Sequence, residues 1–95
     1  MEIHEIVISK TAEKQLRKLP SYIVLKLQAW VESVNHQGLS EIRKIPGFHD
    51  EPLRGKRAGQ RSIRLSKAYR AIYIIDKDGN TELVEILEVN KHDYS

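Results

Sequence analysis

Residues 61–89 read RSIRLSKAYRAIYIIDKDGNTELVEILEV and contain three runs of strand-forming residues. In the first run, residues 61–66, Ile63 and Leu65 alternate with polar side chains, which is typical of a strand with one buried face. Residues 69–75 and 82–89 are rich in β-branched and other apolar residues, and Asp78-Gly79 between them is a hairpin-turn signal. The sequence therefore predicts a three-stranded antiparallel meander in the C-terminal half of the chain.

The pairing of the first two predicted strands depends on where their turn is centred. If the turn is centred on Lys67, Arg64 lies directly opposite Arg70, with about 5 Å between the two Cβ atoms. Like charges that face each other destabilise a sheet, so this arrangement suits a site that binds an anion between them. A turn centred between Lys67 and Ala68 would separate the two arginines. The first register is favoured because it gathers six apolar or aromatic residues on the helix-covered face: Ile63, Leu65, Tyr69, Ala71, Tyr73 and Ile75.

The N-terminal half predicts a strand and two helices before the meander. Residues 2–8 are rich in isoleucine and valine and predict a short strand. The first helix is capped by Ser9 or Thr11 and is stopped by Pro20. The second helix occupies residues 21–38 and ends at a glycine. Its apolar residues follow one stripe of a helix: Ile23, Leu27, Trp30, Val31 and Val34.

This order of elements predicts an α+β fold. A last helical turn, capped by Ser40 and carrying Ile42 and Ile45, completes the helical part. We expect the N-terminal strand and the helical hairpin to pack on one face of a mainly antiparallel, twisted sheet of about four strands. The chain would form a single domain over residues 1–95. The other face of the sheet would stay partly open.

The composition excludes several classes of protein. The chain has 95 residues, with 16 Lys or Arg and 13 Asp or Glu, so its formal net charge is +3. It contains no cysteine, which excludes disulfides, thiolate nucleophiles and cysteine zinc sites. No apolar run reaches the roughly 18–20 residues of a membrane span, and the N-terminal MEIHEIVISK lacks the features of a secretory signal. A small cytoplasmic protein is therefore expected.

Positive charge is concentrated in residues 53–70, which contain no acidic side chain. Five of the seven basic residues are arginines, whose planar guanidinium groups make forked contacts with phosphate or carboxylate. Clustered basic residues are typical of a nucleic-acid-binding surface, although an acidic protein partner can use the same surface. The seven residues are Arg54, Lys56, Arg57, Arg61, Arg64, Lys67 and Arg70.

Two segments carry a resemblance to a known family. They read PLRGKRAGQRSIRLSKAYRAIYIID (52–76) and LVEILEVNKHDY (83–94). They resemble the toxin subunits of bacterial type II toxin–antitoxin modules, the RelE/HigB/ParE superfamily. Its pattern is a Leu-x-Gly segment, a basic strand, Tyr-Arg before an apolar strand, and a last strand that ends in a basic or His-containing tail. The resemblance extends to the N-terminal strand and helical hairpin, so it implies a RelE-like fold.

The resemblance to the RelE and HigB branches implies a ribosome-dependent mRNA endonuclease that inhibits translation. In that reaction the 2′-OH attacks the adjacent phosphate, without a metal or another cofactor. It needs one group that takes the 2′-OH proton, cations that neutralise the phosphorane, and one group that protonates the leaving 5′-oxygen. The absence of a metal agrees with the scattered positions of His4, His36 and His49, which lack the spacing of metal ligands.

The resemblance also assigns roles to individual residues. Arg64 and Arg70 would clamp the scissile phosphate. His92 would act as acid or base, and Tyr94 would stack on or orient the target base. Ser62 stands where RelE carries a lysine, so the proton-transfer role passes to His92. Contacts with substrate RNA or rRNA are assigned to six further basic residues: Arg54, Lys56, Arg57, Arg61, Lys67 and Lys91.

The superfamily implies partners as well. A cognate antitoxin would cover Arg64 and Arg70 or distort the tail with His92. The other expected partners are mRNA and the ribosome, through its decoding site and rRNA. Operator DNA would be reached only through the antitoxin, and no membrane is involved.

Two alternatives to mRNA cleavage remain open. A ParE-like toxin would inhibit DNA gyrase by binding to it, without cutting RNA. A degenerate toxin would act only as an antitoxin-binding module. The Lys-His-Asp-Tyr ending of residues 91–94 favours cleavage.

Overall fold

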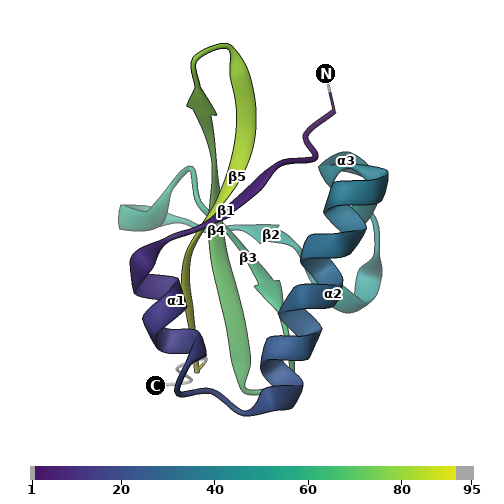
Figure 1. Cartoon of the computed structure of the whole chain (residues 1–95). Helices are drawn as coiled ribbons and strands as arrows, with labels where there is room; N and C mark the ends of the chain where they lie inside the picture. The colour runs from purple at the N-terminus through teal and green to yellow at the C-terminus, as the bar shows by residue number, and fades with distance from the viewer. Residues whose placement is uncertain (1, 92–95) are drawn as a thin grey trace.

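A five-stranded sheet is the central layer of the chain in the computed structural model, which describes residues 2–91 (Figure 1). The strands lie in the order β1-β5-β4-β3-β2. β1 pairs with β5 in parallel, and the other neighbours are antiparallel. The mainly antiparallel sheet is as expected, but it has one strand more than predicted because a two-residue strand extends the β3 edge. The strands are β1 (Ile6–Ile8), β2 (Glu51–Pro52), β3 (Arg61–Arg64), β4 (Tyr69–Asp78) and β5 (Thr81–Lys91).

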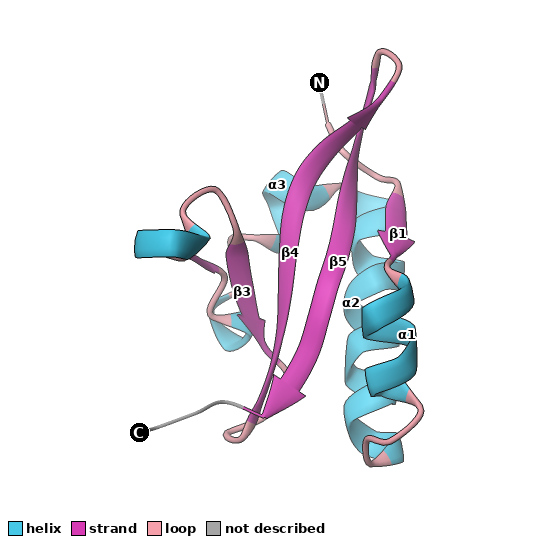
Figure 2. Ribbon diagram, turned by 90° about the vertical axis from the view of Figure 1, so that its left-hand side faces the viewer, coloured by secondary structure: helices cyan, strands magenta, loops and turns pink. Residues whose placement is uncertain are grey.

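The helices lie on one side of this sheet, where α1 (Lys10–Leu16) and α2 (Ser21–Gln37) are neighbours (Figures 1 and 2). Ser9 caps α1, because its hydroxyl accepts a hydrogen bond from a backbone N–H of the first turn at 3.1 Å. Gly38, with a φ of 90°, ends α2 and leads into the short α3 (Leu39–Ile42). The predicted α+β fold is confirmed. None of the helices within residues 2–91 is long and apolar enough to cross a lipid bilayer.

The predicted register between β3 and β4 is also confirmed, since Arg64 pairs with Arg70. The backbone N–H of Leu65 donates to the carbonyl of Tyr69 at 2.9 Å, so these two residues form a hydrogen-bonded pair. The Arg64–Arg70 pair beside it is therefore of the non-hydrogen-bonded type. Side chains approach most closely in such pairs, with about 4.5 Å between the Cα atoms.

A β-bulge changes which side chains of β5 face the helices. Ala71 pairs with Val89 and Tyr73 pairs with Ile86, so β5 has one residue more than β4 between these pairs. As a result Val89 and Ile86 are both buried although they are three positions apart. Simple alternation along the strand does not predict this pattern.

Three expectations about single residues differ from the structure. Ile75 alternates with Tyr73 as expected but is 37% exposed, whereas its partner Val84 on β5 is fully buried. The end of the β4–β5 hairpin extends beyond the helices (Figures 1 and 2). Ser40 does not cap α3, whose N-cap is Gly38. Instead, the hydroxyl and the backbone N–H of Ser40 both donate to the carboxylate of Glu2. Ile45 follows the end of α3 and is 40% exposed.

The core lies between α2 and the sheet. The rings of Trp30 and Tyr73 are fully buried and pack with 5.4 Å between their centroids. The apolar stripe predicted for α2 faces this contact, with Val31 only partly buried. The fully or almost fully buried members of the stripe are Ile23, Leu27, Trp30 and Val34.

We expect Trp30→Ala to lower the free energy of unfolding by about 3–5 kcal/mol, because it leaves a cavity against Tyr73. Leu25→Ala is the matched control on the same helix, since Leu25 is 63% exposed, and it should change the free energy by less than about 0.5 kcal/mol. Urea unfolding followed by far-ultraviolet circular dichroism measures both variants. A similar, small loss in both would contradict the assigned core.

Candidate functional site

The sheet face turned away from the helices carries a hollow of about 270 Å³. Ser62, Arg70 and Ile72 point into it, because they alternate along β3 and β4 with the side chains that are buried against the helices. The hollow is bounded by β2 and the segment after it on one side and by the end of β5 on the other. The residues that line it are Glu51, Leu53, Arg57, Ser62, Arg70, Ile72, Asn90 and Lys91.

Arg70 is held in this hollow by two polar partners. Its Nη1 donates to the hydroxyl of Ser62 at 2.7 Å, and its Nη2 lies 3.4 Å from Oε1 of Glu51. The Ser62 hydroxyl is buried, so its place is fixed by the sheet. Arg64, directly opposite Arg70, makes no side-chain hydrogen bond or ion pair within residues 2–91. The donors of Arg64 are therefore available to a ligand, although Arg64 is not among the residues that line the hollow.

The carboxylate of Glu51 lies beside Arg70 in the same hollow and was not among the site residues predicted from the sequence. Its contact with Arg70 is a single long one at 3.4 Å, and the Glu51 side chain is 55% exposed. An exposed carboxylate held so loosely can turn toward a ligand. One signal in the sequence identifies it: Glu51 is the last acidic residue before the acid-free segment 53–70.

A second carboxylate, Glu88, lies at the edge of the hollow and was also missed. Its Oε2 accepts from Nη2 of Arg57 at 2.5 Å, and its Oε1 accepts from Nδ2 of Asn90 at 2.8 Å. Arg57 also donates to Gln60 at 2.9 Å. Both donor groups of Arg57 are thus engaged within the chain, so Arg57 shapes the wall of the hollow.

The structure brings some of the predicted binding residues to the hollow and leaves others outside it. Arg57 and Lys91 line it, together with Arg70. The exposed Arg54 and Lys56 lie at the 3₁₀ turn that precedes β3. Lys67 lies in the turn between β3 and β4. His92 and Tyr94, predicted as catalytic residues, lie outside the described residues.

Arg61 is the predicted binding residue that the structure separates from the hollow. Strand alternation puts it with Ile63 on the helix-covered face, away from Arg64. There its Nε donates to Oδ1 of Asp50 at 2.6 Å, and the hydroxyl of Tyr73 donates to Oδ2 at 2.6 Å. Burial, the hydrogen bond to Asp50 and the charge of Asp50 raise the pKa of Tyr73, so the phenol keeps its proton. Arg61 is therefore committed to a structural ion pair.

The open face of the sheet carries groups that can bind an oxyanion and accept a proton. Arg70 in the hollow and Arg64 opposite it on β3 carry guanidinium donors that suit a phosphate, and Glu51 supplies an accessible carboxylate beside Arg70. Within residues 2–91, no group of three or more potential ligand residues is arranged to hold a metal ion.

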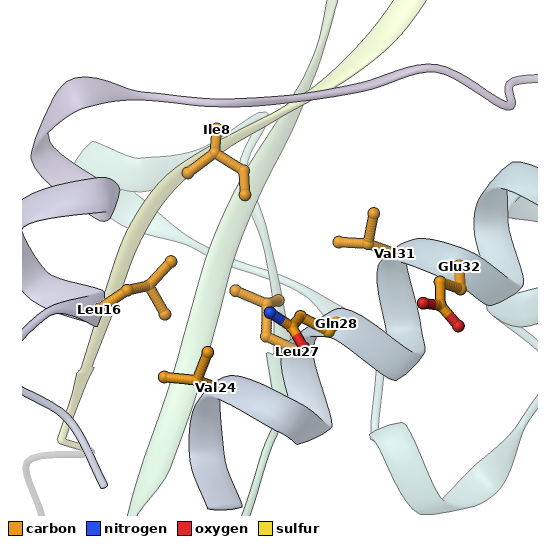
Figure 3. A pocket seen from close by; sticks show the side chains of 7 residues that line it. All are labelled: Ile8, Leu16, Val24, Leu27, Gln28, Val31 and Glu32. Carbon is orange, nitrogen blue, oxygen red and sulfur yellow. The ribbon is translucent and has the colours of Figure 1, made fainter. Parts of the chain in front are cut away.

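A second, apolar hollow of about 420 Å³ lies between α1 and α2 (Figure 3). Ile8, Leu16 and Val24 face it, and Glu32 stands at one end. Its lining holds no basic side chain, so it does not suit a phosphate. The remaining residues that line it are Leu27, Gln28 and Val31.

Comparison with known proteins identifies the family. The family model described as the ParE toxin of type II toxin–antitoxin system, parDE, matches residues 6–93. The chain belongs to this toxin family. The match confirms the resemblance to the RelE/HigB/ParE superfamily that the sequence indicated. The search among curated proteins gave no match.

Solved structures of related toxins share the fold of this ParE-family chain. The RelBE2 toxin–antitoxin complex from Mycobacterium tuberculosis is similar at 30% identity over 97% of this chain and 100% of that one, with a TM-score of 0.59. The archaeal RelE–RelB complex from Pyrococcus horikoshii OT3 matches at 20% identity over 100% of both chains, with a TM-score of 0.68. A YoeB/ParE toxin from Agrobacterium tumefaciens matches at 18% identity over 94% of this chain and 99% of that one, with a TM-score of 0.68. The last two likenesses concern the fold, which is the expected RelE-like one.

We expect Arg64→Ala and Arg70→Ala each to weaken binding of a fluorescent oligoribonucleotide at low salt. Each should also reduce the slope of log affinity against log salt by about 0.7, the value for one lost phosphate contact on a single strand. Lys44→Ala is the matched control, because Lys44 is 71% exposed, pairs with Glu41, and its loss removes the same charge elsewhere. Fluorescence anisotropy at several salt concentrations measures the slopes, and an equal reduction in the Lys44→Ala variant would contradict the assigned site.

Proposed function

We propose that this chain is a toxin that cleaves mRNA on the ribosome, without a metal, by attack of the 2′-OH on the adjacent phosphate. The observation that carries the proposal is the sharing of one sheet face by Arg64, Arg70 and Glu51. A cation pair can stabilise the charge of the phosphorane, and an accessible carboxylate can take the 2′-OH proton, which are two of the three services that this reaction needs. The oxygen–phosphorus bond to the 2′-oxygen forms as the bond to the 5′-oxygen breaks, so the products are a 2′,3′-cyclic phosphate and a 5′-hydroxyl.

Each proposed role follows from the position or the chemistry of the residue. Arg64 and Arg70 bind the scissile phosphate and neutralise the charge that grows on its oxygens in the transition state. Glu51 accepts the proton of the attacking 2′-OH. His92 gives a proton to the leaving 5′-oxygen, because imidazole exchanges protons near neutral pH. Tyr94 stacks on the target base, a contact worth about 1–3 kcal/mol.

The contacts of Arg70 explain how substrate would engage the site. One donor group of Arg70 stays with the buried hydroxyl of Ser62, which fixes the direction of the guanidinium. The other donor group faces Glu51 at 3.4 Å, a contact that a phosphate oxygen replaces at little cost because Glu51 is half exposed. Displaced from Arg70, the carboxylate is free to accept a proton. In the free protein Arg70 and Glu51 therefore pair with each other, and with substrate bound Arg70 would contact the phosphate while Glu51 would contact the 2′-OH.

The proposal includes a cognate antitoxin and the ribosome as partners. Related solved structures are complexes of a toxin with its antitoxin, namely RelBE2, RelE–RelB and the Staphylococcus aureus YoeB–YefM complex. An antitoxin segment with acidic side chains would neutralise this site by covering Arg64 and Arg70. The decoding site would bring rRNA phosphates to the exposed cations around the hollow, among them Arg54 and Lys56. A toxin of translating ribosomes acts in the cytoplasm.

Primer extension on a message translated in a cell-free extract tests the proposed cleavage. Wild-type chain should produce defined cuts, and Arg70→Ala and Glu51→Gln should lower the single-turnover rate at least about a hundredfold, since each removes a group that acts in the transition state. His92→Gln tests the proposed acid in the same assay. Lys44→Ala is the control and should cleave at the wild-type rate. Wild-type cleavage that persists in both Arg70→Ala and Glu51→Gln would reject the assignment.

A second candidate function is inhibition of DNA gyrase without RNA cleavage. It is favoured by one observation, the description of the matching family model as a ParE toxin. The same extract distinguishes the two functions when it is paired with a supercoiling assay. Intact mRNA together with inhibited supercoiling would favour gyrase inhibition. Antitoxin binding without either effect would indicate a degenerate toxin.

A further inference from the structure

Strand β2, which carries Glu51, has little backbone pairing of its own. It has two residues and lies at the edge of the sheet, where its neighbour is β3. Pro52 has no N–H to donate, and the next backbone bond runs from the N–H of Leu53 to the carbonyl of Gln60 at 2.9 Å. A strand this short does not hold a fixed position by backbone pairing alone. Something else must keep the Glu51 carboxylate beside Arg70.

Asp50, immediately before β2, supplies a side-chain anchor. Both of its carboxylate oxygens are engaged, one by Nε of Arg61 at 2.6 Å and the other by the hydroxyl of Tyr73 at 2.6 Å. The backbone carbonyl of Asp50 also accepts from Nη2 of Arg61 at 3.4 Å. The Asp50 side chain is 1% exposed, so water does not compete for these bonds.

The anchor is connected to the aromatic core of the molecule. Tyr73 is fully buried and packs on Trp30, so its hydroxyl occupies a fixed point on the helix-covered face. His49, the residue before Asp50, has a φ of 45°, an uncommon conformation for a non-glycine residue, and it ends the 3₁₀ turn that precedes the anchor.

Asp50 and Glu51 are adjacent in an extended segment, so their side chains point to opposite faces of the sheet. Fixing Asp50 on the helix-covered face therefore fixes Glu51 on the open face, where its carboxylate lies 3.4 Å from Arg70. We propose that Asp50, Arg61 and Tyr73 are positioning residues, which hold β2 so that Glu51 stands at the scissile phosphate. This inference rests on the proposed nuclease function, because it assigns Glu51 a role in cleavage.

Asp50, Arg61 and Tyr73 would not contact the substrate themselves and would act through Glu51. A displacement of about 1 Å at a reacting group is enough to lower a rate about a hundredfold. Affinity for the ribosome should stay unchanged, because the exposed cations that surround the hollow do not depend on Asp50. The expected signature is thus a lower maximal rate with an unaltered half-saturating ribosome concentration.

Tyr73→Phe is the decisive variant, because it removes one hydroxyl from the anchor and keeps the aromatic ring in the core. Asp50→Asn is a second, stronger variant that also leaves Arg61 without its charged partner. Ile23→Val is the matched control: Ile23 is fully buried on α2 and is not one of the three residues of the anchor, so this variant loses stability without removing a group of the anchor. All variants are compared at a temperature at which circular dichroism shows them folded.

Two measurements are made on each variant of the full chain. Amide hydrogen exchange by NMR should show the Leu53 N–H exchanging at least about tenfold faster in Tyr73→Phe, with the Leu65 N–H between β3 and β4 unchanged within about twofold. Single-turnover cleavage on programmed ribosomes should show a maximal rate at least about tenfold lower at an unchanged half-saturating concentration. Ile23→Val should match the wild type in both.

The outcomes separate this inference from the function on which it rests. If the Leu53 N–H exchanges at the wild-type rate in both Tyr73→Phe and Asp50→Asn, the anchoring of β2 is wrong, whatever the cleavage rate of these variants. Faster exchange with a maximal rate like that of Ile23→Val would overturn the positioning role and leave the proposed nuclease intact. Absence of cleavage by the wild-type chain would overturn the nuclease and the positioning role together, while Leu53 exchange would still report whether the cluster holds β2.

Discussion

The pairing of two arginines across adjacent strands is the constraint around which the open face of this toxin is organised. The turn between β3 and β4 sets Arg64 opposite Arg70 in a non-hydrogen-bonded pair, where side chains lie closest. Two like charges in that position repel, and the chain contains no carboxylate that bridges them among the residues described. An anion bound between them would relieve this repulsion, so the register that forms the core also places two cations opposite each other on the open face.

The two faces of the sheet carry different kinds of residues: packing contacts on one face and the candidate site on the other. On the helix-covered face, Asp50 and Tyr73 tie the edge of the sheet to the aromatic core. On the open face, the hydroxyl of Ser62 accepts a hydrogen bond from Arg70, and the carboxylate of Glu51 lies beside the Arg70 guanidinium. Because neighbouring residues of a strand point to opposite faces, each buried contact fixes the place of an exposed functional group one residue away. The packing of the core and the geometry of the site are therefore determined together.

Much of this arrangement follows from local sequence patterns, and the rest depends on tertiary contacts. Alternation and the position of Lys67 predicted the Arg64–Arg70 pair, and periodicity predicted the buried stripe around Trp30. The bulge in β5 was not predictable, because it arises from pairing between distant strands. Charge clustering predicted a basic surface that includes Arg61, and composition does not reveal that Arg61 meets the buried carboxylate of Asp50 on the helix-covered face. Glu51 was missed because a two-residue strand leaves almost no pattern.

Urea unfolding of the wild type and of Arg64→Gln, each with and without an oligoribonucleotide, tests whether Arg64 and Arg70 repel each other in the free chain and bind a phosphate together. If the two arginines repel each other when no phosphate is bound, removing one charge should raise the free energy of unfolding of the free chain by about 0.2–1 kcal/mol. The oligoribonucleotide should then stabilise the wild type more than the variant, because a ligand stabilises the form that binds it. If the free variant is less stable than the free wild type, and RNA stabilises both chains equally, Arg64 and Arg70 do not form a strained pair that binds phosphate.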